Sequence, residues 1–231
     1  MTGVQTCALP ICISGLDDPI GAEGVQADRV KYEWHHNVLI GNPPYDRVES
    51  QGTGGFITAV TKGNKALGER SLFDDIFDDA KKHVIFSAHA SLYNLYVYFW
   101  RWAIWKVFEE NTGPAVVSMI TASSWLDGPG FLGLRRLARE VADEITVIDL
   151  HGDNKGTRKD ENVFDIESPV AIVTLIRHGK GDRSKPAPVR YASYWGTRAE
   201  KLSALTDLTA GKSTLSTLEA SADWYAPLIP T

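Results

Sequence analysis

The chain has 231 residues, of which 43% are hydrophobic and 23% are charged. This composition is typical of a globular protein and excludes a disordered tail, a collagen-like repeat and a low-complexity array. The formal net charge of -5 gives no overall basic field, so any contact with DNA would depend on a local patch. The two cysteines, Cys7 and Cys12, form neither a disulfide framework nor a zinc-ligand spacing, which favours a reducing cytoplasm and no metal site.

The first twelve residues, Met1 to Cys12, have neither the basic region nor the long apolar core of a signal peptide. They resemble the translation of a common sequencing-library adapter, and we expect residues 1–12 to be foreign to the protein. In that case the natural protein extends further upstream and this chain is a fragment, with marginal stability and a tendency to aggregate. The alternative is a natural N-terminal arm.

The first half of the chain predicts one strand and one helix. The apolar run Val38 to Ile40 predicts a buried strand, which Gly41 and two prolines bring to an end. Residues 46–82 have the composition of a loop. Residues 84–110 have apolar side chains at helical spacing and predict a helix that ends at Asn111 to Pro114. That apolar stretch contains Arg101 and Lys106 and is therefore a poor membrane span.

The second half alternates strands and helices, which indicates an α/β fold with a largely parallel sheet. Strands are predicted at 115–120, 145–150 and 170–176, and an amphipathic helix at 131–142. Residues 177–201 then contain seven Lys or Arg against Asp182 and Glu200. We expect residues 13–178 to form one catalytic domain. Residues 179–231 would form a linker and the start of a target-recognition domain, with basic side chains that either line DNA phosphates or are simply solvated.

The most informative motif is Asn42-Pro43-Pro44-Tyr45, at the carboxyl end of the first predicted strand. Ligands of open α/β sheets bind at that edge. The Asn42 side-chain oxygen and the Pro43 carbonyl can accept both hydrogens of one amino group, and the prolines keep the turn stiff. Tyr45 offers a flat face on which a planar base can stack. Such a pocket activates an amino nitrogen whose lone pair is delocalised into a ring. A plain rigid turn is the alternative.

Together with its neighbours, this motif resembles that of the S-adenosylmethionine-dependent amino-methyltransferases, especially the DNA adenine-N6 enzymes. Three further segments match this family in the expected order, namely Asn94 to Phe99, Ala115 to Leu126, and Val163-Phe164 with the following Val170 to Val173. The resemblance covers residues 32–178. It implies a Rossmann-like methyltransferase sheet, of which this chain would hold the C-terminal half, comprising the strands after the cofactor-binding half.

Finer details resemble the large single-chain restriction–modification proteins of type ISP and the Eco57I-like type IIG. These details are Phe99 to Ala103, Asp149 to Gly152 and Lys159 to Asp165. The resemblance implies double-stranded DNA as partner, nuclease and ATPase domains upstream, and no membrane. It also implies methyl transfer from S-adenosylmethionine to an adenine flipped out of the duplex.

In that mechanism Asn42 and Pro43 hold the amine, and Pro44 stiffens the turn. Tyr45 and Phe164 stack on the two faces of the base. Phe99 is the one cofactor contact implied, because the chain has no strand followed by a glycine-rich loop before Asn42.

Two other functions stay open from the sequence. Protein-glutamine and RNA amino-methyltransferases use the same tetrapeptide, although the segment around Phe164 favours DNA. A non-catalytic DNA-binding module that keeps the pocket but not the cofactor is the alternative from another class.

Overall fold

The computed structural model describes residues 23–26, 29–30, 33–45, 63, 71–83, 86–152, 160–179, 183–218 and 221–230. The chain divides into two compact units, residues 1–34 and 35–231. Every element discussed below belongs to the second unit. The adapter-like residues 1–12 and most of the predicted loop 46–82 lie outside the described residues.

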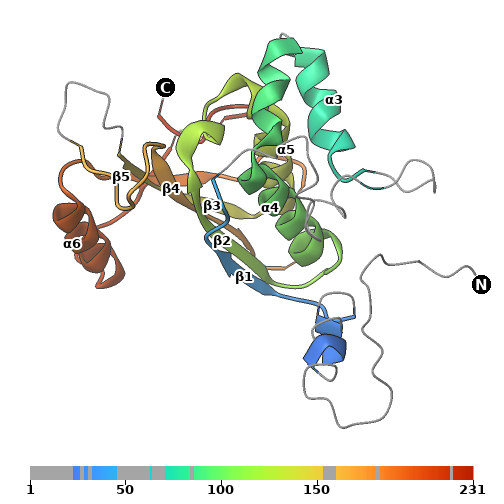
Figure 1. Ribbon diagram of the computed structural model, residues 1–231, viewed down its shortest axis with the longest axis horizontal. Helices are drawn as coiled ribbons and strands as arrows, with labels where there is room; N and C mark the ends of the chain where they lie inside the picture. Colours follow the sequence, from blue (N-terminus) through green and yellow to red (C-terminus); the bar gives the residue numbers. More distant parts are fainter. Residues whose placement is uncertain are drawn as a thin grey trace, which may run out of the picture. The chain divides into compact units, whose positions relative to one another are not determined.

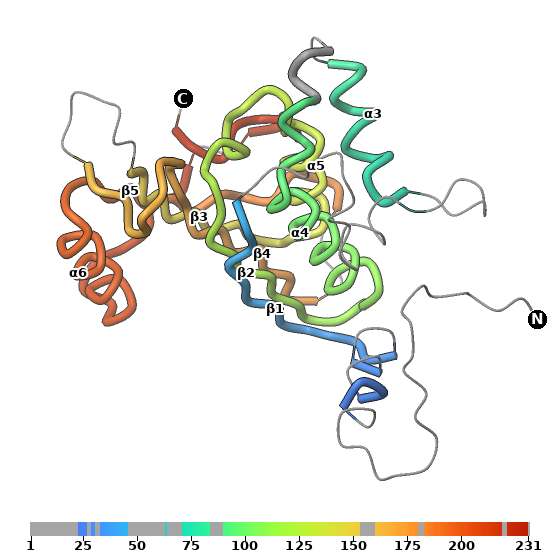
Figure 2. The backbone as a smooth tube through the Cα atoms, viewed as in Figure 1, coloured from blue at the N-terminus to red at the C-terminus, as the bar shows by residue number. Residues whose placement is uncertain are grey.

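One six-stranded sheet organises the second unit, with strand order β1-β2-β4-β3-β5-β6 (Figures 1 and 2). Its strands are β1 (Val38–Gly41), β2 (Ala115–Ala122), β3 (Glu144–His151), β4 (Val170–Arg177), β5 (Val189–Ser193) and β6 (Ser216–Thr217). β1 pairs with β2 and β3 pairs with β5 in parallel, whereas β4 runs antiparallel to both β2 and β3. Four strands therefore point the same way, and β4 and β6 point the opposite way. The predicted α/β class and the largely parallel sheet are confirmed.

Buried and half-buried side chains alternate along the central strands, so one face of the sheet is buried. In β2 every second residue from Ala115 to Thr121 is buried, and those between are half-buried. β4 repeats the pattern, with Val173 and Leu175 fully buried. Because successive side chains of a strand point to opposite faces, one face packs against helices and the other stays partly open.

Three helices lie together beside the sheet in Figure 1, and a fourth lies by β5 at its other end. They are α3 (Asp74–His83), α4 (Leu95–Ile104), α5 (Leu132–Val141) and α6 (Arg198–Thr209). The predicted helix 84–110 is in fact three pieces. A 3₁₀ segment (Phe86–Tyr93) precedes α4, and a π-helical turn (Trp105–Glu109) follows it. α5 falls inside the predicted 131–142.

The helix α3 corrects the prediction of a loop through residue 82. Asp79 on its acidic surface is buried and pairs with Arg136 of α5. Gly133 of α5 makes this approach possible, since a Cβ there would meet the Ile76 carbonyl oxygen at 2.6 Å. The helix therefore packs against α5, which the polar composition of this segment does not indicate.

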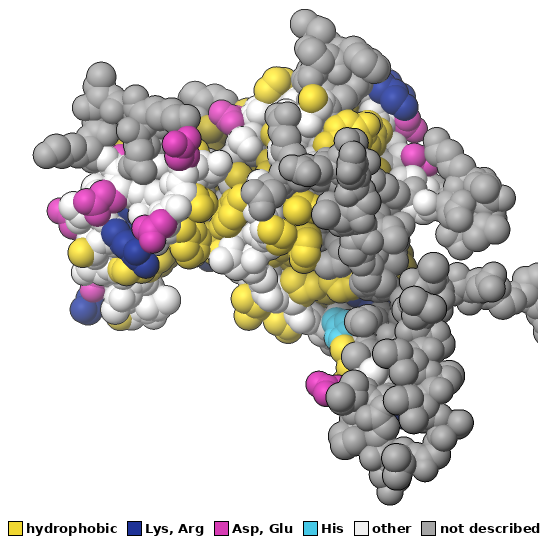
Figure 3. Space-filling model, in the orientation of Figure 1, with side chains coloured by type: hydrophobic (Ala, Val, Ile, Leu, Met, Phe, Trp, Pro, Cys, Tyr) yellow, Lys and Arg dark blue, Asp and Glu magenta, His cyan; other side chains and the backbone are white. Residues whose placement is uncertain are grey.

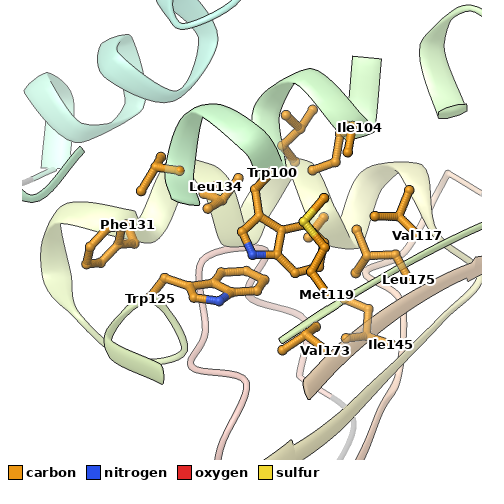
Figure 4. Close-up of a cluster of buried hydrophobic side chains, with 14 of the residues drawn as sticks. Trp100, Ile104, Val117, Met119, Trp125, Phe131, Leu134, Ile145, Val173 and Leu175 are labelled. Atoms are coloured by element: carbon orange, nitrogen blue, oxygen red, sulfur yellow. The ribbon is translucent and has the colours of Figure 1, made fainter. Parts of the chain in front are cut away.

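The main core lies between α4, α5 and β2, and two tryptophans occupy its centre (Figure 4). The rings of Trp100 and Trp125 lie 5.1 Å apart between centroids, and both side chains are fully buried. Both indole N–H groups donate to the hydroxyl of Thr121, at 3.2 and 3.3 Å. One hydroxyl oxygen of β2 thus satisfies two buried donors.

Buried arginines hold the loops through main-chain carbonyls. Arg177 donates to the carbonyls of Phe108, Asn111 and Gly113 at 2.7–2.9 Å, which closes the end of the π-helical turn. Arg135 and Arg139 of α5 each donate to three carbonyls in the same way. Through these bonds α5 fixes the segment Tyr225–Pro227. Burial lowers the pKa of Arg135 to about 10, so the guanidinium stays charged at neutral pH.

β1 forms one edge of the sheet, and among the described residues only β2 pairs with it. Two of its apolar side chains, Val38 and Ile40, are 60% and 80% exposed. Figure 3 shows hydrophobic side chains gathered across the middle of the face that it draws. The strand at Val38 to Ile40 is therefore present, but the prediction that it is buried is wrong, because within the described residues it pairs on one side only. None of the described helices is long and apolar enough to cross a membrane.

Residues 177–201 do not form a free connection. β5 pairs with β3 over five residues and extends the same sheet. Arg177 and Lys201 are buried, and Arg190 pairs with Glu144 at 3.3 Å. Three of the basic side chains that could line DNA phosphates or be solvated, those of Arg177, Arg190 and Lys201, thus make internal contacts. That residues 179–231 begin a target-recognition domain stays a prediction.

Candidate functional site

The tetrapeptide Asn42–Tyr45 lies where the sequence predicts it, directly after β1 at the carboxyl end of the parallel strands. Pro43 is buried and Tyr45 is half-buried, whereas Asn42 and Pro44 are exposed. The buried proline fixes the turn against the sheet, and the Asn42 side chain stays accessible to a ligand.

The hydroxyl group of Tyr45 ties this turn to the next strand. It donates to Asn42 Oδ1 at 3.0 Å and lies 3.3 Å from the carbonyl oxygen of Ile120 in β2. Burial raises the pKa of Tyr45 to about 12, so the phenol remains a donor at neutral pH. Its hydrogen bond orients the Asn42 amide with the oxygen toward Tyr45. The second lone pair of that oxygen can still accept a hydrogen bond.

The structure brings Tyr45 and Phe164 together, although 118 positions separate them in the sequence. Their ring centroids lie 6.4 Å apart, with the planes tilted by 50°. A base between two rings needs two stacking distances of about 3.5 Å each. The rings therefore have to move slightly apart and become more nearly parallel to admit one.

The loop that carries Phe164 is held by hydrogen bonds from its own asparagine. Asn162 is buried, and its Oδ1 accepts the N–H of Phe164 at 3.0 Å. Its Nδ2 donates to the carbonyls of Ser168 at 2.8 Å and Gly152 at 3.4 Å. Beside this loop lies a hollow of about 420 Å³, lined by Glu161, Asn162, Phe164, Asp165, Ile166, Glu167 and Arg198. Its three carboxylates against one arginine suit a base or an amine better than a phosphate.

A second group of polar and aromatic side chains lies at the ends of β3 and β5. His151 adopts a left-handed φ of 50° and stacks on Trp195 with 3.6 Å between ring centroids. Its Nε2 lies 2.7 Å from the hydroxyl of Ser193, and its Nδ1 lies 3.4 Å from Asp149. Burial raises the pKa of Asp149, against the opposing influence of His151. The sequence marked Asp149 and His151 but missed Ser193 and the ring contact with Trp195.

The helix motif Asn94 to Phe99 and the turn after β2 are also in contact. Tyr96 is buried, and its hydroxyl lies 3.0 Å from the hydroxyl of Ser124. Phe99 is half-buried and packs against the main core. Among the described residues β1 is the first strand, so the strand and glycine-rich turn that the resemblance places before Asn42 are not seen there. Phe99 remains the one predicted cofactor contact among them.

The basic residue that sequence reasoning most misjudged is Lys201 in α6. Its side chain is fully buried, and its ammonium bonds to Asp160 Oδ1 at 2.8 Å and to two carbonyls at 2.6 Å. Nothing in the local sequence distinguishes it from a solvated lysine. The sequence does indicate the start of the helix that carries Lys201, because Thr197 and Glu200 form a capping box there.

Neither a protein-family model nor a curated protein matches the sequence. Solved structures do match the fold. The ATP-dependent Type ISP restriction–modification enzyme LlaBIII bound to DNA has a TM-score of 0.66 and 21% identity, over 91% of this chain and 14% of its own. A nuclease-deletion mutant of the Type ISP enzyme LlaGI with a DNA substrate mimic has a TM-score of 0.63 and 21% identity, over 89% of this chain and 19% of its own. The DrdV–DNA complex has a TM-score of 0.61 and 21% identity, over 90% of this chain and 19% of its own.

At this identity the likeness shows the fold. The chain spans less than a fifth of the length of each of these three proteins, while they cover about nine-tenths of the chain. The second unit of the chain therefore has the fold of a segment found within restriction–modification enzymes.

Proposed function

We propose that this chain is the substrate half of a site-specific DNA adenine-N6 methyltransferase within a restriction–modification protein. The observation that carries the proposal is the meeting of Tyr45 and Phe164, 6.4 Å apart, beside the accessible oxygen of Asn42. The three solved structures of similar fold are complexes with DNA or a DNA mimic. This supports double-stranded DNA as the partner.

The exposed Asn42 turn is proposed to bind the exocyclic amine of adenine. Its Oδ1 keeps one lone pair engaged by Tyr45 and offers the other to an N–H of the amine. The Pro43 carbonyl accepts the second hydrogen. Two acceptors on one amine draw its hydrogens out of the ring plane and return electron density to nitrogen, which favours attack on an electrophilic methyl group.

The two rings are proposed to hold the extruded base. Stacking of a base on an aromatic side chain is worth about 1–3 kcal/mol. Two such contacts offset the few kcal/mol that extrusion from the duplex costs. The acidic hollow beside Phe164 keeps phosphates away from this pocket, so the backbone contacts of the DNA lie elsewhere on the protein.

The methyl donor in this proposal is S-adenosylmethionine, and its main binding site lies outside the described residues. The proposal places nuclease and ATPase domains upstream in the same protein, and the protein in the cytoplasm. The residues described here bind and orient the base.

The test is methyl transfer by the full-length protein from radiolabelled S-adenosylmethionine to duplex DNA, with ribosomal RNA and a glutamine-containing release factor as rival substrates. Asn42→Ala is expected to lower the turnover about 10²- to 10³-fold, as for loss of one oriented polar group. Asn42→Asp keeps an acceptor oxygen and serves as the matched variant that retains more activity.

Two outcomes would overturn the proposal. Methylation of RNA or of a glutamine side chain in place of DNA would assign the site to another amino-methyltransferase. Salt-sensitive binding of DNA without any transfer would favour a non-catalytic binding module.

A further inference from the structure

The ring of Phe164 is held by a chain of buried polar groups that begins in α6. Lys201 is fully buried, and each of its three ammonium hydrogens has an acceptor. The acceptors are the Leu150 carbonyl at the end of β3, the Glu161 carbonyl and Asp160 Oδ1. The helix is thereby connected both to the sheet and to the start of the loop.

The carboxylate of Asp160 bonds to three separate segments of the chain. Its Oδ2 accepts the N–H of Gly152 at 2.6 Å, and its Oδ1 accepts the N–H of Gly196 at 2.9 Å in addition to Lys201. The N–H of Glu161 then donates to the Gly196 carbonyl at 2.9 Å. A buried carboxylate with this many donors is satisfied, and removal of the Lys201 ammonium would leave its charge uncompensated.

Asn162 connects the backbone at Gly152 to the backbone of Phe164. Its backbone lies so close to Gly152 that a Cβ there would meet the Asn162 Cα at 2.7 Å. Gly152 also has a φ of +102°, which a glycine adopts freely. The Asn162 side chain closes the turn by accepting the Phe164 N–H at 3.0 Å. The direction in which the ring leaves the backbone is therefore set by buried groups.

We propose that Lys201, Asp160 and Asn162 are positioning residues that hold the loop of Phe164 beside Tyr45, so that only a small opening of the two rings is needed to capture an extruded base. The inference rests on the proposed function and adds to it that α6 controls base capture. The three residues act through Phe164. They are not required to touch the base themselves.

The test uses the full-length protein and duplex DNA with 2-aminopurine at the target position, because the fluorescence of this base rises when it leaves the stack. Phe164→Ala is expected to lower the flipped fraction and the transfer rate about 5- to 150-fold, the equivalent of one stacking contact. Asn162→Ala removes three side-chain hydrogen bonds, of which the one to the Phe164 N–H bears directly on the ring, and is expected to lower both at least about five- to tenfold.

A double-mutant cycle separates positioning from general stability. In the Phe164→Ala background, Asn162→Ala is expected to have no further effect on the flipped fraction, because the ring that it positions is gone. Lys201→Met is expected to behave as Asn162→Ala does if the variant folds. Lys212→Met is the matched control, because Lys212 is exposed and pairs only with Asp207 at the surface.

The outcomes keep the two proposals apart. If the unaltered protein neither flips nor methylates the base, the proposed function fails. If the protein and Phe164→Ala behave as expected but Asn162→Ala flips the base normally, the positioning inference alone fails. Additive effects of Asn162→Ala and Phe164→Ala would also overturn it.

Discussion

Replacement of Thr121 by valine tests the core directly. Valine has nearly the shape of threonine, so packing in β2 is preserved and only the hydroxyl is lost. The indole donors of Trp100 and Trp125, both on fully buried side chains, then lose their shared acceptor. Each buried donor without a partner costs about 1–3 kcal/mol, so the expected loss of unfolding free energy is about 2–6 kcal/mol.

That loss is a large share of the ~5–15 kcal/mol that stabilises a typical domain. For a chain of this size it corresponds to roughly 2–4 °C in Tm per kcal/mol. Urea and thermal unfolding, followed by tryptophan fluorescence and circular dichroism, measure the loss.

Thr174→Val is the matched control for this experiment. It makes the same change in β4 of the same sheet, but Thr174 is half-buried, and within the described part of the chain its hydroxyl bonds only to that of Ser118, at 2.8 Å. The control is expected to lose at most about 1 kcal/mol. Equal losses in the two variants would refute the argument that the indole donors depend on Thr121.

Three further predictions follow from the site and its supports. Tyr45→Phe keeps the stacking face but frees the Asn42 oxygen, and should lower methyl transfer about fivefold, whereas Tyr45→Ala should lower it further, by up to about 150-fold; an unaltered rate in Tyr45→Phe would exclude the orienting role, and equal losses in the two variants would exclude the stacking role. Burial opposes ionisation of Asp160, but its hydrogen bonds prevail and lower its pKa, so stability from this group is present above about pH 5 and is lost as the pH falls below about 4. When Tm is measured from pH 6 to pH 3, Asp160→Asn should lack the fall in Tm that protonation of Asp160 causes in the unaltered protein. Parallel curves of Tm against pH for the two proteins would contradict this. Arg177→Lys should lower the urea midpoint by the equivalent of about 1–3 kcal/mol, since one ammonium replaces a fork that satisfies three carbonyls. Arg190→Lys is its control, because Arg190 is only half-buried and pairs with Glu144, and an equal effect there would count against the fork.

The apolar runs of the sequence correctly predicted the positions of four strands. The runs at 38–40, 115–120, 145–150 and 170–176 each became a strand of the sheet. β5 escaped prediction because Val189–Ser193 contains no apolar run and follows two prolines. Its stability comes from pairing with β3, which is a long-range contact. The helix α3 was missed for a related reason, since its acidic surface concealed the buried Ile76 and Ala80.

The candidate site divides in the same way. The position of Asn42 to Tyr45 after a strand, at the ligand-binding edge of the sheet, is readable from a strand followed by two prolines. Only the resemblance related Phe164 to Tyr45 in the sequence; the structure places their ring centroids 6.4 Å apart, and their roles on a base stay proposals. The burial of Lys201 was not readable, because a lysine's surroundings depend on segments 40 to 51 residues away in the sequence.

Three of the buried arginines have a consequence for how this fold can diverge. Arg135, Arg139 and Arg177 bond to main-chain oxygens, which every amino acid supplies. A residue that is held only through its carbonyl oxygen can change its side chain as long as its backbone path is kept. Substitution is therefore expected to be tolerated better at Ala226, whose carbonyl accepts from Arg139, than at the arginines themselves.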